Sequence, residues 1–114
     1  MVAAVACTAS GCVFVQGPPK TITYEFDGSG ESTDVYYNTL EERVDRDDLD
    51  LGRLASDEKT VTYTLPAGKP WYAGMVVSAD YGSEGTVSCR ILVDGVVVSS
   101  DSDDLIAHCT YSVD

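Results

Sequence analysis

Cys89-Arg90-Ile91-Leu92-Val93-Asp94-Gly95-Val96-Val97-Val98 is the stretch of sequence that decides the fold. From Val87 to Val93 every second residue is apolar, as in a strand with one buried face. Asp94-Gly95 follows directly, and this pair favours a type I′ turn because both central residues of that turn need positive φ. The stretch therefore predicts a β-hairpin whose second strand begins at Val96.

The same period of two continues on both sides of this hairpin. It predicts strands at residues 21–26, 34–38, 60–65, 71–80, 86–93, 96–98 and 105–113. Seven short strands separated by turns predict an all-β domain, a seven-stranded immunoglobulin-like antiparallel β-sandwich. We expect it to span residues 20–114, because a chain of 114 residues fits one domain.

The segment from Leu40 to Glu58 breaks the alternation with eight acidic residues. It predicts a long acidic loop, in which the leucines either share one side of a helical turn or tether the loop to the core. Four of its acids are a weak calcium candidate, since calcium takes six to eight oxygen ligands: Asp45, Asp47, Asp48 and Asp50. The distal glutamate of an EF-hand is absent, so a solvated acidic loop is favoured and no metal is predicted. A second acidic loop is expected at residues 99–104.

Two cysteines, Cys89 and Cys109, lie at inward-facing positions of their predicted strands. They predict a disulfide between two neighbouring strands, which is typical of small exported domains. Closing a loop of this size stabilises the fold by about 3 kcal/mol. The alternative is two free buried thiols, which pack as small apolar side chains.

Residues 1–19 contain no charge before Lys20 and are interpreted as a residual signal or anchor segment with a short Pro-rich linker. As a helix, the apolar residues 1–15 would reach only ~22 Å, short of the ~30 Å hydrocarbon core of a bilayer. Ala9-Ser10-Gly11-Cys12 resembles a bacterial lipobox, which makes Cys12 a candidate for lipidation, with Cys7 a weaker second candidate. The alternative is an unmodified remnant of a signal or anchor.

Charge and chemistry exclude several functions. The net charge is −12, which disfavours nucleic acid and anionic lipid headgroups. The single histidine, His108, is next to the inward-facing Cys109 in a predicted strand. Because successive side chains point to opposite faces, His108 is expected to face solvent. No nucleophile, base and acid can be placed together, so we predict a protein that is not an enzyme and has no cofactor.

Two of the seven tyrosines, Tyr36 and Tyr72, fall on the side of their strands opposite the expected core. Aromatic side chains with a polar tip are common at protein interfaces, so these two are candidates for a partner or ligand surface. The alternative is ordinary cross-strand packing on an outer face.

The quoted hairpin, together with Thr23-Tyr24-Glu25, Val35-Tyr36-Tyr37, Pro70-Trp71 and Ala107-His108-Cys109, resembles the soluble domain of the mycobacterial membrane protein small (MmpS) family. The resemblance covers the chain from Thr21 to its end. It implies a β-sandwich on the outer face of an actinobacterial membrane, where members of the family are usually anchored by one N-terminal transmembrane helix; for this chain we expect an N-terminal anchor or a lipid.

The resemblance also implies a partner, an RND-type MmpL exporter that moves siderophores or lipids. We therefore expect an extracytoplasmic, membrane-associated accessory protein of export. The alternative is a lipid-anchored or secreted immunoglobulin-like module that binds a ligand or a surface partner. The chain departs from the family in lacking a full transmembrane helix and in its long segment from Leu40 to Glu58.

Overall fold

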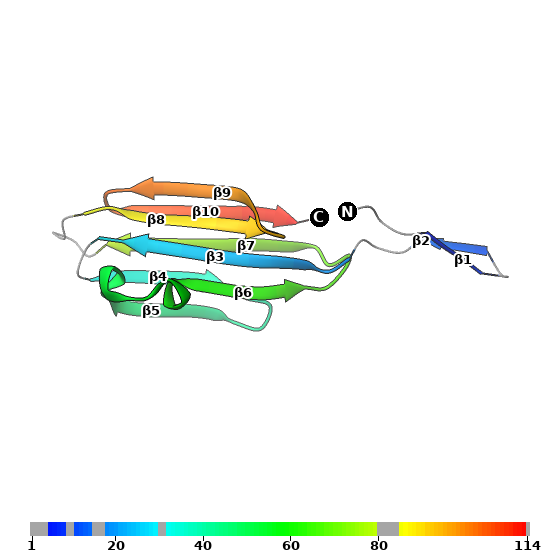
Figure 1. The fold of residues 1–114 in the computed structure, drawn as a ribbon, viewed down its shortest axis with the longest axis horizontal. Coiled ribbons are helices and arrows are strands. Elements are labelled where there is room, and N and C mark those ends of the chain that lie inside the picture. The colour runs from blue at the N-terminus through cyan, green and yellow to red at the C-terminus, as the bar shows by residue number, and fades with distance from the viewer. Residues whose placement is uncertain (1–4, 9–10, 15–17, 30–31, 80–84, 114) are drawn as a thin grey trace.

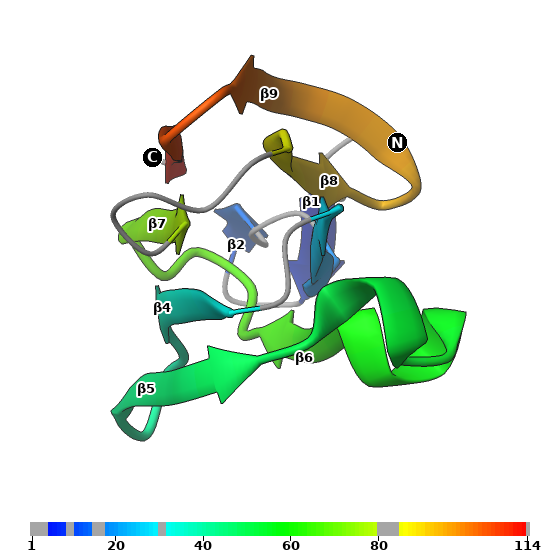
Figure 2. The same ribbon diagram turned by 90° about the vertical axis from the view of Figure 1, so that its left-hand side faces the viewer.

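A computed structural model describes residues 5–8, 11–14, 18–29, 32–79 and 85–113. Two four-stranded antiparallel sheets pack face to face, as the end-on view in Figure 2 shows. One sheet has the order β6-β3-β8-β9, formed by Thr60–Leu65, Lys20–Gly28, Val87–Val93 and Val96–Asp103. The other has the order β10-β7-β4-β5, formed by Ile106–Val113, Trp71–Ala79, Thr33–Asn38 and Arg43–Leu49. The predicted all-β sandwich is confirmed at this level.

The number and order of the strands differ from those expected. The sandwich has eight strands rather than seven. Its first two strands, β3 and β4, lie in opposite sheets, whereas the immunoglobulin fold pairs its first two strands within one sheet. In Figure 1 the β6-β3-β8-β9 sheet lies in front of the other sheet.

The additional strand is β5, which lies inside the segment expected to be an acidic loop. It pairs with β4 and forms the edge of its sheet. The second expected acidic loop is also largely strand, because β9 continues to Asp103. Both strands lie at sheet edges, where charged residues are common because they discourage pairing with another chain.

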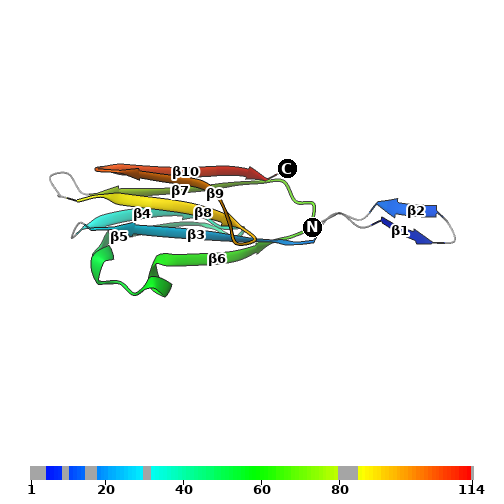
Figure 3. The ribbon, with the colours of Figure 1, turned by 45° about the horizontal axis from the view of Figure 1, so that its top comes forward.

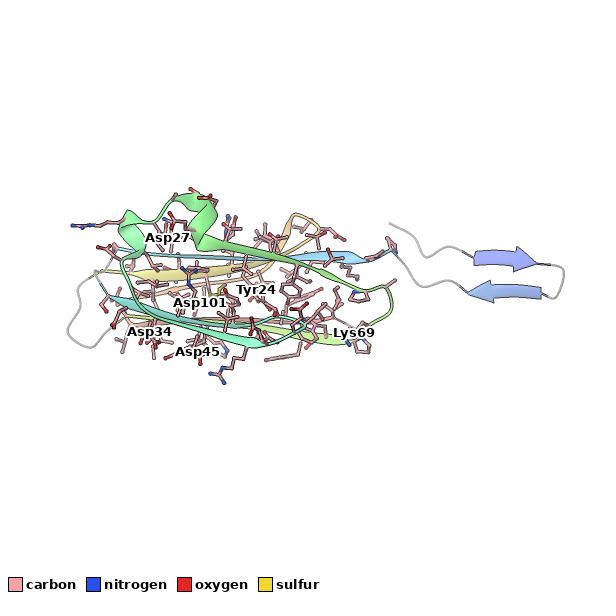
Figure 4. All side chains as sticks on the ribbon, turned by 90° about the horizontal axis from the view of Figure 1, so that it is seen from below. Tyr24, Asp27, Asp34, Asp45, Lys69 and Asp101 are labelled. Carbon is pink, nitrogen blue, oxygen red and sulfur yellow. A yellow bond between two sulfur atoms is a disulfide. The ribbon has the colours of Figure 1, made fainter. Side chains whose placement is uncertain are left out.

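The core fills the space between the sheets with the residues that the alternation placed inward. From β3 these are Ile22, Tyr24 and Phe26, each at most 2% exposed. Strands β7 and β8 likewise bury every second residue along their length. Figure 4 shows Tyr24 between the two layers.

The predicted turn at Asp94 and Gly95 is confirmed, with φ of 50° and 82°. Its aspartate also ties the β8–β9 hairpin to β3. The Thr21 amide donates to Asp94 Oδ1 over 2.8 Å, and the Asp94 amide donates to the Thr21 carbonyl over 2.9 Å. The pairing of β3 with β8 is thereby extended beyond Ile22 and Val93.

Between β5 and β6 the chain forms two 3-10 helices, η1 (Leu51–Arg53) and η2 (Ser56–Lys59). Leu51 is fully buried against β3. A Cβ at Gly28 would lie only 3.1 Å from the Leu51 Cδ1 atom, so glycine allows this close approach. The leucine thus tethers the segment to the core, which is one of the two arrangements expected for it.

Two acids in the last part of β9 accept hydrogen bonds from amides at the start and edge of β10. Asp103 Oδ2 accepts the amides of Leu105 and Ile106 over 3.0 and 2.9 Å. Asp101 Oδ2 accepts the His108 amide over 3.0 Å. These bonds satisfy donors of an edge strand, and the Ile106 and Leu105 amides lower the pKa of Asp103.

Strands β1 (Val5–Thr8) and β2 (Gly11–Phe14) form a separate two-stranded sheet, visible beyond one end of the sandwich in Figure 3. Of the expected signal or anchor segment, residues 1–4, 9–10 and 15–17 lie outside the described residues. In the described part of the chain, no helix is long and apolar enough to cross a membrane.

Candidate functional site

The predicted disulfide between Cys89 and Cys109 is present, and both residues are at most 1% exposed. Its strands, β8 and β10, belong to different sheets, so the bond crosses the core instead of joining neighbours within one sheet. The two Cα atoms are 6.2 Å apart, within the usual range. The bond fixes the packing of one layer on the other beneath both outer faces.

Tyr36 and Tyr72 lie on the outer face of the β10-β7-β4-β5 sheet and line one shallow hollow of about 220 Å³. Tyr72 is 59% exposed, and Tyr36 on the neighbouring strand is half-buried. The structure therefore brings the two predicted tyrosines together. We call this surface the tyrosine face, defined by these residues: Tyr36, Tyr72, Gly74, Val76, His108 and Thr110.

Strand register explains how the tyrosine face is assembled. Tyr36 on β4 is opposite Val76 on β7, and Val76 is opposite His108 on β10. These three side chains form a row across the sheet, because residues at paired positions point to the same side. His108 is exposed, as its parity predicted.

Gly74 lines the hollow, and the side chain of Asn38 bonds the backbone of β7 at Tyr72 and Gly74. The Gly74 amide donates to Asn38 Oδ1 over 2.8 Å, and Asn38 Nδ2 donates to the Tyr72 carbonyl over 2.8 Å. The side-chain amide thus holds β7 at the point where the β4–β7 register ends, at Tyr37 and Met75. A Cβ at Gly74 would meet only ordinary contacts, with Asn38 Oδ1 at 3.7 Å as the nearest.

A partly buried hydrogen-bonded network connects to the backbone of Asn38. Trp71 Nε1 donates to Tyr63 Oη over 2.8 Å, Tyr63 Oη lies 2.7 Å from Tyr24 Oη, and Tyr24 Oη donates to the Asn38 carbonyl over 2.8 Å. An indole nitrogen only donates and a carbonyl only accepts, so the bonds run in one direction from Trp71 to Asn38. Sequence alternation placed these aromatics inward but gave no sign of the network.

Burial raises the pKa of Tyr24 far above that of an exposed tyrosine, and its hydrogen bond to Tyr63 raises it further. The pKa of Tyr63 is also raised, again mainly by burial. Both phenols therefore stay neutral and act as hydrogen-bond donors across the ordinary pH range. The network has a structural role and supplies no ionised group to the tyrosine face.

Charged side chains of β4 and β5 lie around Tyr36. The Arg43 guanidinium carbon lies 5.7 Å from the centre of the Tyr36 ring, and Arg43 Nε lies 3.4 Å from Asp45 Oδ1. Desolvation and then the carboxylates of Asp34, Asp47 and Asp45 raise the pKa of Tyr36. Figure 4 shows Asp34 and Asp45 at the same side of the sandwich. The rim of the tyrosine face is therefore acidic next to β5.

The four calcium candidates are spread out rather than gathered. Asp45 pairs with Arg43, Asp48 Oδ1 accepts the Ser32 hydroxyl over 3.0 Å, and Asp50 Oδ2 lies 3.3 Å from Arg53 Nε. Asp47 is exposed on β5. Within the described residues no group of three or more histidine, cysteine, aspartate or glutamate residues could hold a metal ion. The suggestion that this segment forms a calcium loop is therefore not supported by the geometry.

The other outer face carries a larger hollow of about 730 Å³ that no sequence pattern singled out. It is lined by charged and hydroxyl side chains of β3, β8, β9 and η2. Its walls include Ser100 and Ser102, which the sequence placed in a loop, so only the structure reveals the hollow.

Cys12, the candidate for lipidation, lies in β2 opposite Cys7. Modification of Cys12 stays a prediction. A comparison with protein-family models finds none that matches this chain. No curated protein matches it either.

Proposed function

We propose that the protein is a non-enzymatic, extracytoplasmic accessory subunit of an RND-type exporter of the MmpL class, assisting the export of siderophores or lipids. The observation that carries this proposal is the tyrosine face, where Tyr36 and Tyr72 meet around one hollow. The motifs that resemble the MmpS family suggest which class of partner the face serves.

The size and chemistry of the hollow favour a protein partner. Its volume of about 220 Å³ is below the 300–1,000 Å³ usual for small-molecule sites, so it suits a single side chain of a partner. Tyrosines bury a large apolar ring while keeping a polar tip, and they are enriched at interfaces. Ile106, on the same strand as His108, adds a 48% exposed apolar side chain.

The acidic rim next to β5 suggests how the partner is oriented. Asp34, Asp45 and Asp47 lie near the Tyr36 phenol, and the whole chain carries a net charge of −12. A partner surface with a basic segment beside an apolar side chain would complement this pattern. Rim charges of this kind act mainly on association rate and register.

The disulfide supports an oxidising location outside the cytoplasm. Structural disulfides persist in exported proteins and are rare in cytosolic ones. Cys89 and Cys109 are buried in the core, so the bond is a structural element rather than a reactive pair.

Complementation of a gene deletion tests the proposal. Strains that lack the gene receive the wild type, the double variant Tyr36→Ala/Tyr72→Ala, or Val97→Ala, which alters an exposed residue of β9 on the other sheet. Extracellular siderophore and lipid are then measured. We expect the wild type and Val97→Ala to restore export and the double variant to fail at equal protein level. Undiminished export in the deletion strain contradicts the proposal.

The second candidate function is a lipid-anchored or secreted immunoglobulin-like module that binds a ligand or a surface partner. The large polar hollow on the β6-β3-β8-β9 sheet favours it. It predicts a mature N-terminus at acylated Cys12 and no transporter partner. Mass spectrometry of the membrane-extracted protein distinguishes it from the first candidate.

A further inference from the structure

The larger hollow is a groove on the outer face of the β6-β3-β8-β9 sheet. Figure 2 shows β9 and the 3-10 helices projecting outward on either side of β3 and β8. Glu25 and Arg90 lie on the floor, Ser100 on the β9 wall and Lys59 on the η2 wall. The volume of about 730 Å³ falls within the range of small-molecule sites.

Four of the five charged side chains that line this groove form two ion pairs. Arg90 pairs with Glu25, and Lys59 Nζ lies 3.0 Å from Asp27 Oδ1. The remaining carboxylate, Asp101, accepts the His108 amide over 3.0 Å. An anionic ligand would have to displace Glu25 or Asp27 from its cation, and it would also meet the net charge of −12. The groove therefore favours a neutral ligand over an anionic one.

The rest of the lining supplies hydroxyl groups. Four serines and a threonine line the groove: Ser56, Ser88, Ser100, Ser102 and Thr60. Each hydroxyl both donates and accepts hydrogen bonds. The Arg90–Glu25 pair adds charged donors beside charged acceptors, and hydrogen bonds to charged groups are roughly twice as strong as neutral ones.

We propose that this groove binds a neutral oligosaccharide. Adjacent sugar hydroxyls offer a donor and an acceptor side by side, which matches the guanidinium and carboxylate of Arg90 and Glu25. A sugar has no charge that would compete for either partner. The proposal does not depend on the exporter role, because the groove and the tyrosine face lie on opposite sheets.

The η2 wall is held in place before any ligand binds. The Thr60 hydroxyl donates to the Ser56 carbonyl over 2.9 Å, and the Ala55 amide donates to Glu58 Oε1 over 3.2 Å. Lys59 then ties η2 to β3 through Asp27. A preformed wall lowers the ordering cost of binding.

NMR titration of the ¹⁵N-labelled full chain with maltotriose, cellotriose and chitotriose tests the proposal. At least one trisaccharide should cause saturable shifts at Glu25, Arg90 and Ser100 but not at Tyr72. Arg90→Gln should weaken that binding about tenfold, since it removes a charged donor. Tyr72→Ala, on the opposite sheet, should leave it unchanged.

Ser100→Leu is a second variant, on an exposed edge position where folding is least affected. It replaces a lining hydroxyl with an apolar side chain and should also weaken binding. Three results would overturn the proposal: no shift with any trisaccharide at about 10 mM, shifts that cluster around Tyr72, or unchanged affinity in both Arg90→Gln and Ser100→Leu.

Discussion

The hydroxyl of Tyr24 lies 2.8 Å from the carbonyl oxygen of Asn38, and this contact joins the buried core to the tyrosine face. The side-chain amide of the same asparagine bonds the peptide groups of Gly74 and Tyr72. The position of Tyr72 on the outer surface therefore depends on a hydrogen bond made inside the sandwich.

Tyr24→Phe should destabilise the fold by about 1–2 kcal/mol, because it leaves buried partners in the network without a hydrogen bond. The change keeps the ring and its packing, so a cavity does not contribute. Urea unfolding monitored by tryptophan fluorescence measures the loss. A variant as stable as the wild type would show that the network contributes nothing to stability.

Alkaline pH should destabilise the wild type more steeply than Tyr24→Phe. The folded pKa of Tyr24 is raised above its ordinary value of 10.0, so its stabilising effect is complete below that pH. Above it the unfolded chain releases the phenol proton while the folded chain keeps it, and stability falls as pH rises. Urea midpoints measured from about pH 8 to about pH 11 compare the two slopes. Parallel slopes would contradict the assignment.

Thr33→Val should leave the fold unchanged or stabilise it by about 1 kcal/mol, since a buried hydroxyl without a partner carries a desolvation cost. Thr33 is fully buried in β4, and its Oγ1 atom has no hydrogen-bond partner among the residues that the structure describes. Valine keeps the branched shape. Thermal unfolding checks the result, with Thr33→Ala as the control that removes volume. Clear destabilisation by valine would reveal an unseen partner of the hydroxyl.

Replacing both bridge cysteines, as Cys89→Ala/Cys109→Ala, should lower the free energy of unfolding by about 3 kcal/mol, chiefly because the unfolded chain is released from its crosslink. The bond spans 20 residues. In a domain with a typical stability of 5–15 kcal/mol this is a large fraction. Denaturant unfolding of the wild type with and without reductant should reproduce the difference. Equal midpoints would mean that the bond adds no stability.

The strands that could be predicted have one clearly apolar face. Strand β3 alternates Ile22, Tyr24 and Phe26 with polar residues, and its burial follows that pattern. Strand β5 could not be predicted, since Val44 is the only apolar residue before Leu49 and the rest are charged. It lies at an edge, where one neighbour and little burial are enough to hold a charged strand.

The candidate site could be predicted only in part, for a similar reason. Alternation along each strand predicted that Tyr36 and Tyr72 face outward. The two side chains lie close together because β4 and β7 are neighbours in the sheet, and the alternation along one strand carries no information about its neighbours. Parity likewise placed Cys89 and Cys109 inward without distinguishing a bond within one sheet from one between two. The supporting roles of Asn38 and Gly74 arise from contacts between strands.

Photo-crosslinking in cells tests the central claim most directly. A photoreactive phenylalanine analogue is placed at Tyr72, or at Val97 on the opposite sheet as a control with 44% exposure. The account predicts an adduct with the RND-type exporter from position 72 and none from position 97. No exporter adduct from position 72, or equal adducts from both positions, would contradict it.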